Sequence, residues 1–144
     1  MDYMSAFAIS ASGMSVEKLR LDVTALNIAN VHSTRDRDGA GYEPLQVISA
    51  ARQGQLFRSA FAAESLRLAG GAEVLEVRPV AVAPRLVYEP SHPAADEKGF
   101  VAYPGINPVN EMVTMIVAMR AYEANVTVME MTKRMASTAL RLMA

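Results

Sequence analysis

The 144-residue chain contains no cysteine, which excludes disulfide bonds, thiolate nucleophiles and zinc sites built on thiolates. The chain also lacks an excess of positive or negative charge, since its net charge is −1. Strong electrostatic attraction to nucleic acid is therefore not expected. With 51% apolar residues the composition is not that of a disordered chain. The sequence therefore predicts one modest folded domain without redox or polyanion-binding chemistry.

Membrane spans and a cleavable secretory signal are also absent from the pattern. Asp2 stands where a signal peptide carries basic residues, and the first cation is Lys18. The uncharged run 3–16 is too short and too rich in Ser and Ala to cross a bilayer. We expect a chain that does not span a membrane and that, if it leaves the cytoplasm, uses a route without an ordinary signal peptide.

Candidate catalytic and metal-binding groups are few. His32 and His92 lie 60 positions apart, and neither shares a helix face with a second ligand. A calcium loop over 34–45 is excluded because Leu45 stands where a bidentate Glu is needed. The sequence has no nucleophile elbow around a serine and no phosphate-binding Gly-rich loop. We predict no catalytic residue, no metal site, no cofactor and no enzymatic activity.

Proline placement divides the chain, because all seven prolines lie between Pro44 and Pro108. The two ends can therefore form long helices, whereas the middle cannot. A helix is predicted over 2–30, and Gly13 in its interior indicates the close approach of another backbone, a kink or a frayed first half. In the middle, short strands are predicted over the following ranges, the last broken by two prolines: 47–51, 56–61 and 74–88.

The C-terminal segment has the clearest periodicity. Asn107 is predicted to cap a helix that has Pro108 at its first position. Alternate steps of three and four residues predict one heptad-type seam, interrupted by a single lysine: Met112, Met115, Met119, Tyr122, Val126, Met129, Lys133, Ala136, Leu140 and Met143. This pattern predicts a long amphipathic helix of coiled-coil character that projects from the domain.

These patterns together predict a mainly α fold with a small β insertion. The N- and C-terminal helices are expected to pair as a coiled coil, and the middle is expected to be β-rich. The expected divisions are 1–34 for the first helix, 35–106 for the β-rich region with a connector loop, and 107–144 for the last helix. Such a chain has a small core, so we expect each copy to need neighbours to bury its seam.

Three stretches have a distinctive pattern. The first is 21–34, with the core Asn27-Ile28-Ala29-Asn30 followed by Thr34; the second is 88–101 running on to 112; the third is 119–126. Together they resemble the flagellar basal-body rod and hook protein family, and the second is similar to the loop of the proximal rod members. By spacing alone, Asn27 and Asn30 could equally serve simple helix termination, and Pro90 and Pro93 could hold the second stretch as an extended connector.

The resemblance implies a structural subunit of the proximal rod that transmits torque and forms part of the export-channel wall. It implies paired terminal helices around an axial channel, an outer β domain, unfolded export through the flagellar type III apparatus, and a place in the periplasmic rod among copies of itself and other rod proteins. The expected assembly residues are Asn27, Ile28, Ala29, Asn30, Thr34, Met112, Ile116, Met119, Tyr122, Glu123, Asn125, Val126 and Met129.

Two other classes stay open from the sequence. A soluble type III secretion adaptor or chaperone with a helical hairpin would bind a partner helix in a groove. A helix lying on a membrane surface would need a basic polar face, yet the first 30 residues carry only Lys18 and Arg20 as cations. We rank the rod subunit first and the membrane-surface helix last.

Overall fold

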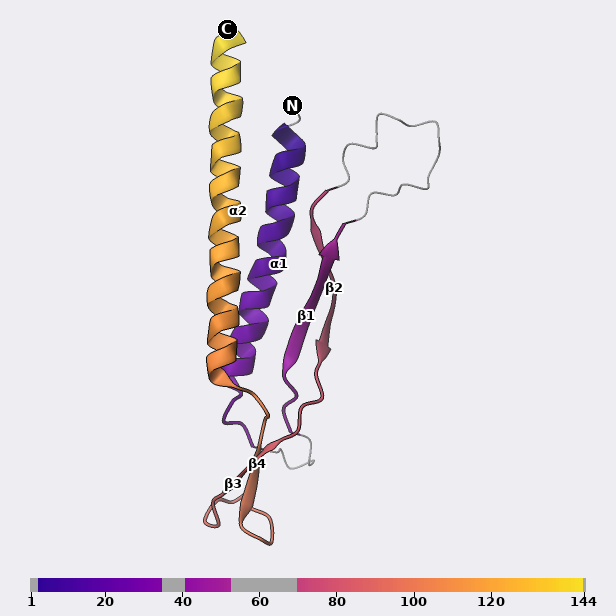
Figure 1. Ribbon diagram of the computed structural model, residues 1–144, viewed down its shortest axis with the longest axis vertical. Coiled ribbons are helices and arrows are strands. Elements are labelled where there is room, and N and C mark those ends of the chain that lie inside the picture. Colours follow the sequence, from indigo (N-terminus) through magenta and orange to yellow (C-terminus); the bar gives the residue numbers. More distant parts are fainter. Residues whose placement is uncertain (1–2, 35–40, 53–69, 144) are drawn as a thin grey trace, which may run out of the picture.

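The computed structural model describes residues 3–34, 41–52 and 70–143. Two long helices, α1 (Tyr3–Ala29) and α2 (Pro108–Met143), run side by side in opposite directions (Figure 1). A two-stranded hairpin lies along α1, and a second hairpin lies beyond the end where α1 stops and α2 starts. The predicted arrangement of two terminal helices around a small β-rich middle is confirmed.

The first helix runs without interruption through Gly13, from Tyr3 to Ala29. The close neighbour is a side chain of α2: a Cβ atom added at Gly13 would lie 3.0 Å from Oδ1 of Asn125. Glycine costs about 1 kcal/mol relative to alanine inside a helix. Here that cost permits a close approach of the two helices.

The second helix begins as the sequence predicts. Oδ1 of Asn107 accepts hydrogen bonds from the backbone N–H groups of Val109 at 3.0 Å and Asn110 at 3.4 Å, which makes Asn107 the N-cap. Glu111 in the first turn and Arg141 in the last complement the helix dipole. With 36 residues against 27, α2 extends past the start of α1 (Figure 1).

Two contacts define the register of the helix pair. Gly13 lies against Asn125, and Asn27 is hydrogen-bonded to Glu111, so the contacts are fourteen residues apart on both helices. The less exposed positions of α2 recur at the spacing of a heptad, and most are small or polar: Glu111, Met115, Ala118, Tyr122, Asn125, Met129, Thr132, Ala136 and Ala139.

This packed side differs from the predicted seam at every second position. Met115, Tyr122, Met129 and Ala136 are shared by both, but Met112 and Met119 are 52% and 43% exposed in the single chain. Ala118, next to Met119, is completely buried. Small side chains such as Ala118 alternate with Met115, Tyr122 and Met129 on the inner line and allow the close approach at Gly13, and Met112 and Met119 lie outside.

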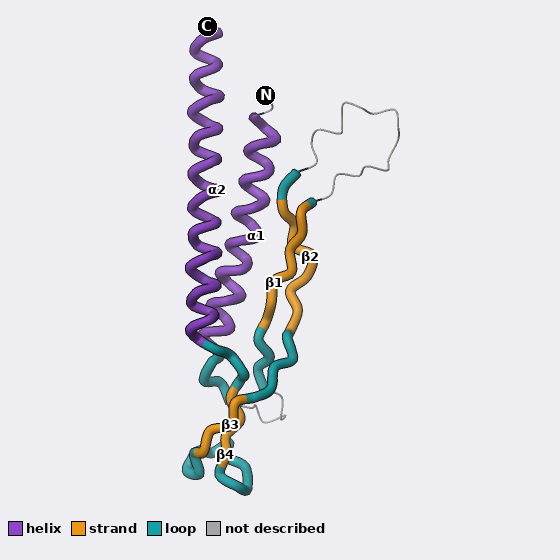
Figure 2. The backbone as a smooth tube through the Cα atoms, in the orientation of Figure 1, coloured by secondary structure: helices purple, strands orange, loops and turns teal. Residues whose placement is uncertain are grey.

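The first hairpin pairs β1 (Leu45–Ala51) with β2 (Ala72–Pro79) in antiparallel register, with a bulge between Ile48 and Ser49 (Figure 2). Both strands pack against α1, where Val16 and Val23 are buried. The strands predicted over 47–51 and from 74 are thereby confirmed within a few residues. The strand predicted over 56–61 lies outside the described residues.

The second hairpin pairs β3 (Arg85–Tyr88) with β4 (Phe100–Tyr103). Because β2 ends at Pro79 and β3 starts after Pro84, the predicted break at the two prolines is confirmed. The predicted extended connector is wrong: the segment after Tyr88 forms successive turns, with hydrogen bonds from the N–H of His92 to the carbonyl of Glu89 and from Ala95 to His92.

Within the part of the chain that the structure describes, the buried apolar side chains are few. They are Val16, Val23, Val31, Val101, Tyr103, Ile106 and Ala118. Most of them lie near the junction of the helices with the hairpins. Neither of the two described helices combines the length and the apolar character that crossing a membrane requires.

Candidate assembly interface

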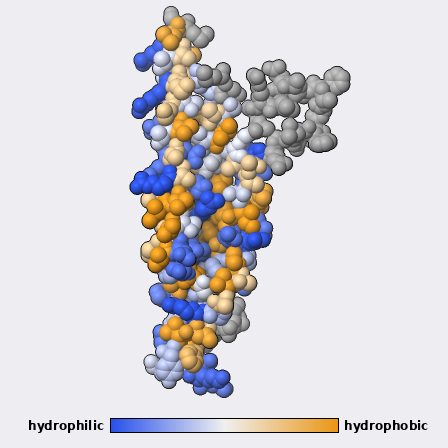
Figure 3. Space-filling model, in the orientation of Figure 1, coloured by the Kyte–Doolittle hydropathy of each residue, from blue (hydrophilic) through white to orange (hydrophobic). Residues whose placement is uncertain are grey.

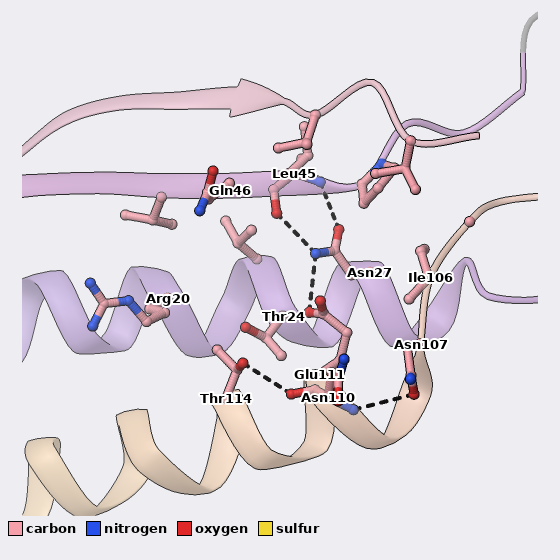
Figure 4. Close-up of a pocket in the computed structure, with 16 residues that line it drawn as sticks. Arg20, Thr24, Asn27, Leu45, Gln46, Ile106, Asn107, Asn110, Glu111 and Thr114 are labelled. Carbon is pink, nitrogen blue, oxygen red and sulfur yellow. Dashed lines mark hydrogen bonds between the residues drawn. The ribbon is translucent and has the colours of Figure 1, made fainter. Parts of the chain in front are cut away.

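Asn27 is the centre of the junction between α1, β1 and α2. Its side chain is 3% exposed, and all of its hydrogen-bonding capacity is used. Oδ1 accepts bonds from the N–H of Leu45 at 2.9 Å and from the hydroxyl of Tyr42 at 2.8 Å. Nδ2 donates to the carbonyl of Leu45 at 2.9 Å and to Oε2 of Glu111 at 3.2 Å (Figure 4).

Asn27 and Asn30 use their side-chain amides differently. The amide of Asn27 binds the backbone of Leu45, on a segment eighteen positions further along the chain. Asn30 behaves differently, because its Nδ2 donates to the carbonyl of Leu26 inside the same helix at 2.9 Å. Asn27 therefore fixes tertiary structure, whereas Asn30 ends the helix.

The carboxylate of Glu111 introduces a negative charge at this junction. Burial raises the pKa of the Tyr42 hydroxyl above its ordinary value, and the charge of Glu111 raises this pKa further. Arg20 also lies here, but its guanidinium forms an ion pair with Glu17 at 2.7 Å and a hydrogen bond to Ser49 at 3.2 Å. Both charged groups therefore act as structural anchors.

A cleft of about 510 Å³ opens beside this junction. Figure 4 shows that its walls come from α1, the start of α2 and the β1–β2 hairpin. Its polar lining residues are Arg20, Thr24, Asn27, Gln46, Asn107, Asn110, Glu111 and Thr114. The carboxylate of Glu111, which lines the cleft, accepts the hydrogen bond from Nδ2 of Asn27 at 3.2 Å, so this wall of the cleft is part of the structural junction.

The other expected assembly residues of the first segment are spread around the end of α1. Ile28 and Thr34 are half-buried, and Ala29 is exposed. The carbonyl of Asn30 accepts a hydrogen bond from the hydroxyl of Ser33 at 2.8 Å. Only Asn27 of this group faces the cleft, and the rest surround the turn that follows the helix.

The expected assembly residues of α2 fall into two sets. Tyr122, Asn125, Val126 and Met129 are half-buried on or beside the α1 side. Met112, Ile116 and Met119 are exposed, and Glu123 is exposed with its carboxylate paired to Arg120 at 2.9 Å. Figure 3 shows apolar surface along the outside of this helix. The first set holds the chain together, and the second is available to neighbours.

The sequence did not indicate Tyr42, Leu45 or Glu111 as partners of Asn27. No local signal indicates these partners, since Glu111 is 84 positions from Asn27. Metal binding also has no candidate among the described residues, where no three His, Asp or Glu side chains gather.

The two long helices have exposed apolar faces, and the buried hydrogen bonds of Asn27 join them. These features are typical of a subunit of a larger assembly. A family model for the C-terminal region of flagellar basal body rod FlgEFG proteins matches residues 97–142. The chain is 35% identical over 150 residues to the flagellar basal-body rod protein FlgC of Borreliella burgdorferi, with 99% of both chains covered.

Two further relatives have the same name. The protein of Aquifex aeolicus is 38% identical over 136 residues, covering 92% of this chain and 91% of the relative. The protein of Escherichia coli O6:H1 is 36% identical over 142 residues, covering 99% and 98%. The chain therefore belongs to the FlgC family of flagellar basal-body rod proteins.

Membership in this family confirms the predicted resemblance and the prediction that the chain is a structural protein and not an enzyme. The alternative of a type III secretion adaptor finds no support, because these relatives are named as rod proteins.

Proposed function

We propose that this chain is a structural subunit of the proximal flagellar rod, assembling there with other rod proteins and with copies of itself. In this role α1 and α2 form a coiled coil that lines the export channel and transmits torque, and the β hairpins face outward. The chain reaches the periplasmic part of the basal body unfolded, through the flagellar type III apparatus, without a cleavable signal.

The exposed apolar face at the start of α2 carries this proposal. Val109, Met112, Ile116 and Met119 are 66%, 52%, 53% and 43% exposed on one helix. Complete burial of one such side chain is worth about 1.5–3 kcal/mol, and a contiguous exposed apolar surface marks an interaction site. Neighbouring subunits provide the cover that the single chain lacks.

The expected assembly residues divide between two roles. Asn27, Tyr122, Asn125, Val126 and Met129 set the shape of the subunit by holding the junction and the helix pair. The residues that meet neighbouring subunits are Ile28, Ala29, Asn30, Thr34, Met112, Ile116, Met119 and Glu123. Assembly therefore depends on both groups, but only the exposed members of the second, Ala29, Met112, Ile116, Met119 and Glu123, can be altered without disturbing the fold of a single chain.

Substitutions at Ile116 test the proposal, because its side chain is already exposed. Ile116→Asp places a charge in the subunit contact and should abolish incorporation into basal bodies and swimming while the chain is still synthesised. Ile116→Val keeps an apolar surface and should assemble. Immunoblots of isolated basal bodies and motility in soft agar measure both, and normal assembly of the aspartate variant would contradict the proposal.

A further inference from the structure

A second apolar line runs along the outside of α2, away from the face that packs on α1. We call it the outer stripe; it consists of Val113, Val117, Ala124, Val128, Met131, Met135 and Leu142, all of them exposed. Successive positions are three or four residues apart, with Arg120 and Thr138 at the intervening places, so the line stays on one side of the helix. A periodic apolar line on a helix is typical of a seam with a second helix.

The first helix also has an exposed line at the same spacing. Its members are Met4, Ala8, Ala11, Ser15, Lys18, Asp22, Ala25 and Ala29. We call it the outer face of α1. Most side chains here are small, whereas those of the outer stripe are large, so the two surfaces are complementary in size and are carried by the same chain.

We infer that the outer stripe of α2 packs against the outer face of α1 in a second copy of this chain. The inference rests on the proposed rod function and specifies one of its subunit contacts. Such a contact joins two different surfaces, so each copy has one neighbour on either side. It extends around a ring or helix instead of stopping at a dimer.

Charge complementarity indicates how far the neighbouring copy is displaced along the helix axis. On α1, Lys18 and Asp22 are four residues apart; on α2, Arg120 and Glu123 are three apart and paired with each other at 2.9 Å, and all four are exposed. Within the chain the helices are antiparallel, and the register of the helix pair sets Lys18 level with Arg120. A neighbour in the same orientation without an offset would therefore bring two cations together.

An offset of about one helical turn, ~5 Å along the helix axis, removes this repulsion. It places Asp22 opposite Arg120 and, at the same time, Lys18 opposite Ala124, next to Glu123. Opposite charges at the edge of a helix seam are the usual determinants of register and partner choice. One displacement thus satisfies both pairs, and it predicts a stepped arrangement of neighbouring copies.

The lack of cysteine in the chain makes a disulfide test unambiguous. The double variant Ala11→Cys/Met131→Cys joins positions that face each other in the offset contact, and Ala29→Cys/Val113→Cys does the same at the other end. Mild oxidation of basal bodies isolated from cells with either variant should give a ladder of covalent multimers. The four single-cysteine variants should give no ladder, and Ala11→Cys/Glu130→Cys, which moves the α2 thiol off the stripe, should give much less.

Each outcome has a defined meaning. Dimers from Met131→Cys alone would indicate a two-fold α2–α2 contact and overturn the inference. Absence of a ladder from both double variants, with the chain present in the basal bodies, would overturn the inference while leaving the rod function intact. Absence of the unaltered chain from basal bodies would instead refute the proposed function.

A charge exchange tests the offset independently. The described part of the chain contains no ion pair between Asp22 and Arg120, so any compensation between these positions must act between copies. Arg120→Glu should reduce incorporation and swimming, and adding Asp22→Lys should restore part of both. Arg120→Glu with Ser15→Lys is the matched control and should not recover. Equal recovery in the two double variants would contradict the offset.

Discussion

Asn27 and Glu111 lie 84 positions apart in the sequence, and a hydrogen bond of 3.2 Å joins Nδ2 of Asn27 to Oε2 of Glu111. The same asparagine binds both backbone groups of Leu45. One side chain therefore connects the end of α1, the start of β1 and the first turn of α2. The relative position of the helices and the first hairpin depends on this contact.

Replacement of Asn27 tests the importance of this centre. Asn27→Ala removes four hydrogen bonds and leaves the N–H and carbonyl of Leu45 without their Asn27 partner. Loss of a buried hydrogen-bonding partner costs about 1–3 kcal/mol, so the free energy of unfolding should fall by at least this amount. Urea unfolding of the purified chain, followed by circular dichroism, measures the change.

Asn30→Ala is the matched control for Asn27→Ala. Asn30 loses only one hydrogen bond, to the carbonyl of Leu26 within its own helix. The expected loss is below about 1 kcal/mol. Equal effects of the two substitutions would show that Asn27 has no special role in holding the elements together.

The close approach of Gly13 to Asn125 predicts non-additive substitutions. Gly13→Ala gains about 1 kcal/mol of helix propensity, but its new methyl group would press on Asn125 at 3.0 Å. We therefore expect little net change in the unaltered background. In Asn125→Ala the contact is gone, and the same substitution should stabilise by about 1 kcal/mol. A double-mutant cycle in urea measures the difference, and an equal gain in both backgrounds would exclude the steric explanation.

Gly71 predicts a stronger effect from the same type of substitution. Its φ angle is +116°, and an added Cβ would lie 2.5 Å from Oγ of Ser12. That oxygen accepts a hydrogen bond from the N–H of Ala72 at 3.0 Å. Gly71→Ala should destabilise by about 1–3 kcal/mol through backbone strain alone, and thermal unfolding would measure it.

Gly70→Ala provides the comparison for Gly71→Ala. No positive φ angle occurs at Gly70, and an added Cβ there would meet the flexible end of Ile9. The loss should therefore be clearly smaller than at Gly71. Equal losses at the two glycines would argue against backbone strain as the cause.

The Tyr42 hydroxyl predicts an alkaline limit to stability. Burial and the charge of Glu111 raise its pKa in the folded chain above the ordinary value of about 10. The unfolded chain therefore releases this proton first as the pH rises. The stability contributed by neutral Tyr42 is complete below pH about 10 and is lost as the pH increases toward the folded pKa.

Two variants measure this contribution. Tyr42→Phe should lower stability near neutral pH, because the hydrogen bond to Asn27 is lost, but its stability should decline less steeply above pH about 10. Glu111→Gln should lower the Tyr42 pKa toward the ordinary value, as read from tyrosinate absorbance. An unchanged Tyr42 absorbance titration in Glu111→Gln would show that the carboxylate does not act on the hydroxyl.

The long helices were predictable because their signals are local. Proline is confined to the middle, and an Asn107-Pro108 pair marks the start of α2. The second hairpin was not predicted as such, because β4 has only four residues and follows a segment with two prolines. Its pairing with β3 depends on contacts between residues on either side of the turns, and the periodicity of a short segment does not reveal such contacts.

The candidate assembly residues show the same division. Periodicity identified Met115, Tyr122 and Met129 on the packed side of α2, but not that its alternate positions are Ala118 and Asn125. A search for apolar periodicity selects positions with large apolar side chains. On the packed side of α2 the alternate positions are small or polar, because this allows the helices to come close at Gly13.

The amino-acid sequence by itself determined the absence of thiol chemistry, the helical ends, the divided middle and the resemblance to rod proteins. Each of these follows from composition or from residues close together in the chain. Only the tertiary structure decided which side of each helix is covered and which is left for a neighbour. That choice depends on the contacts of Asn27 and Gly13 with α2, made between segments separated by about a hundred residues.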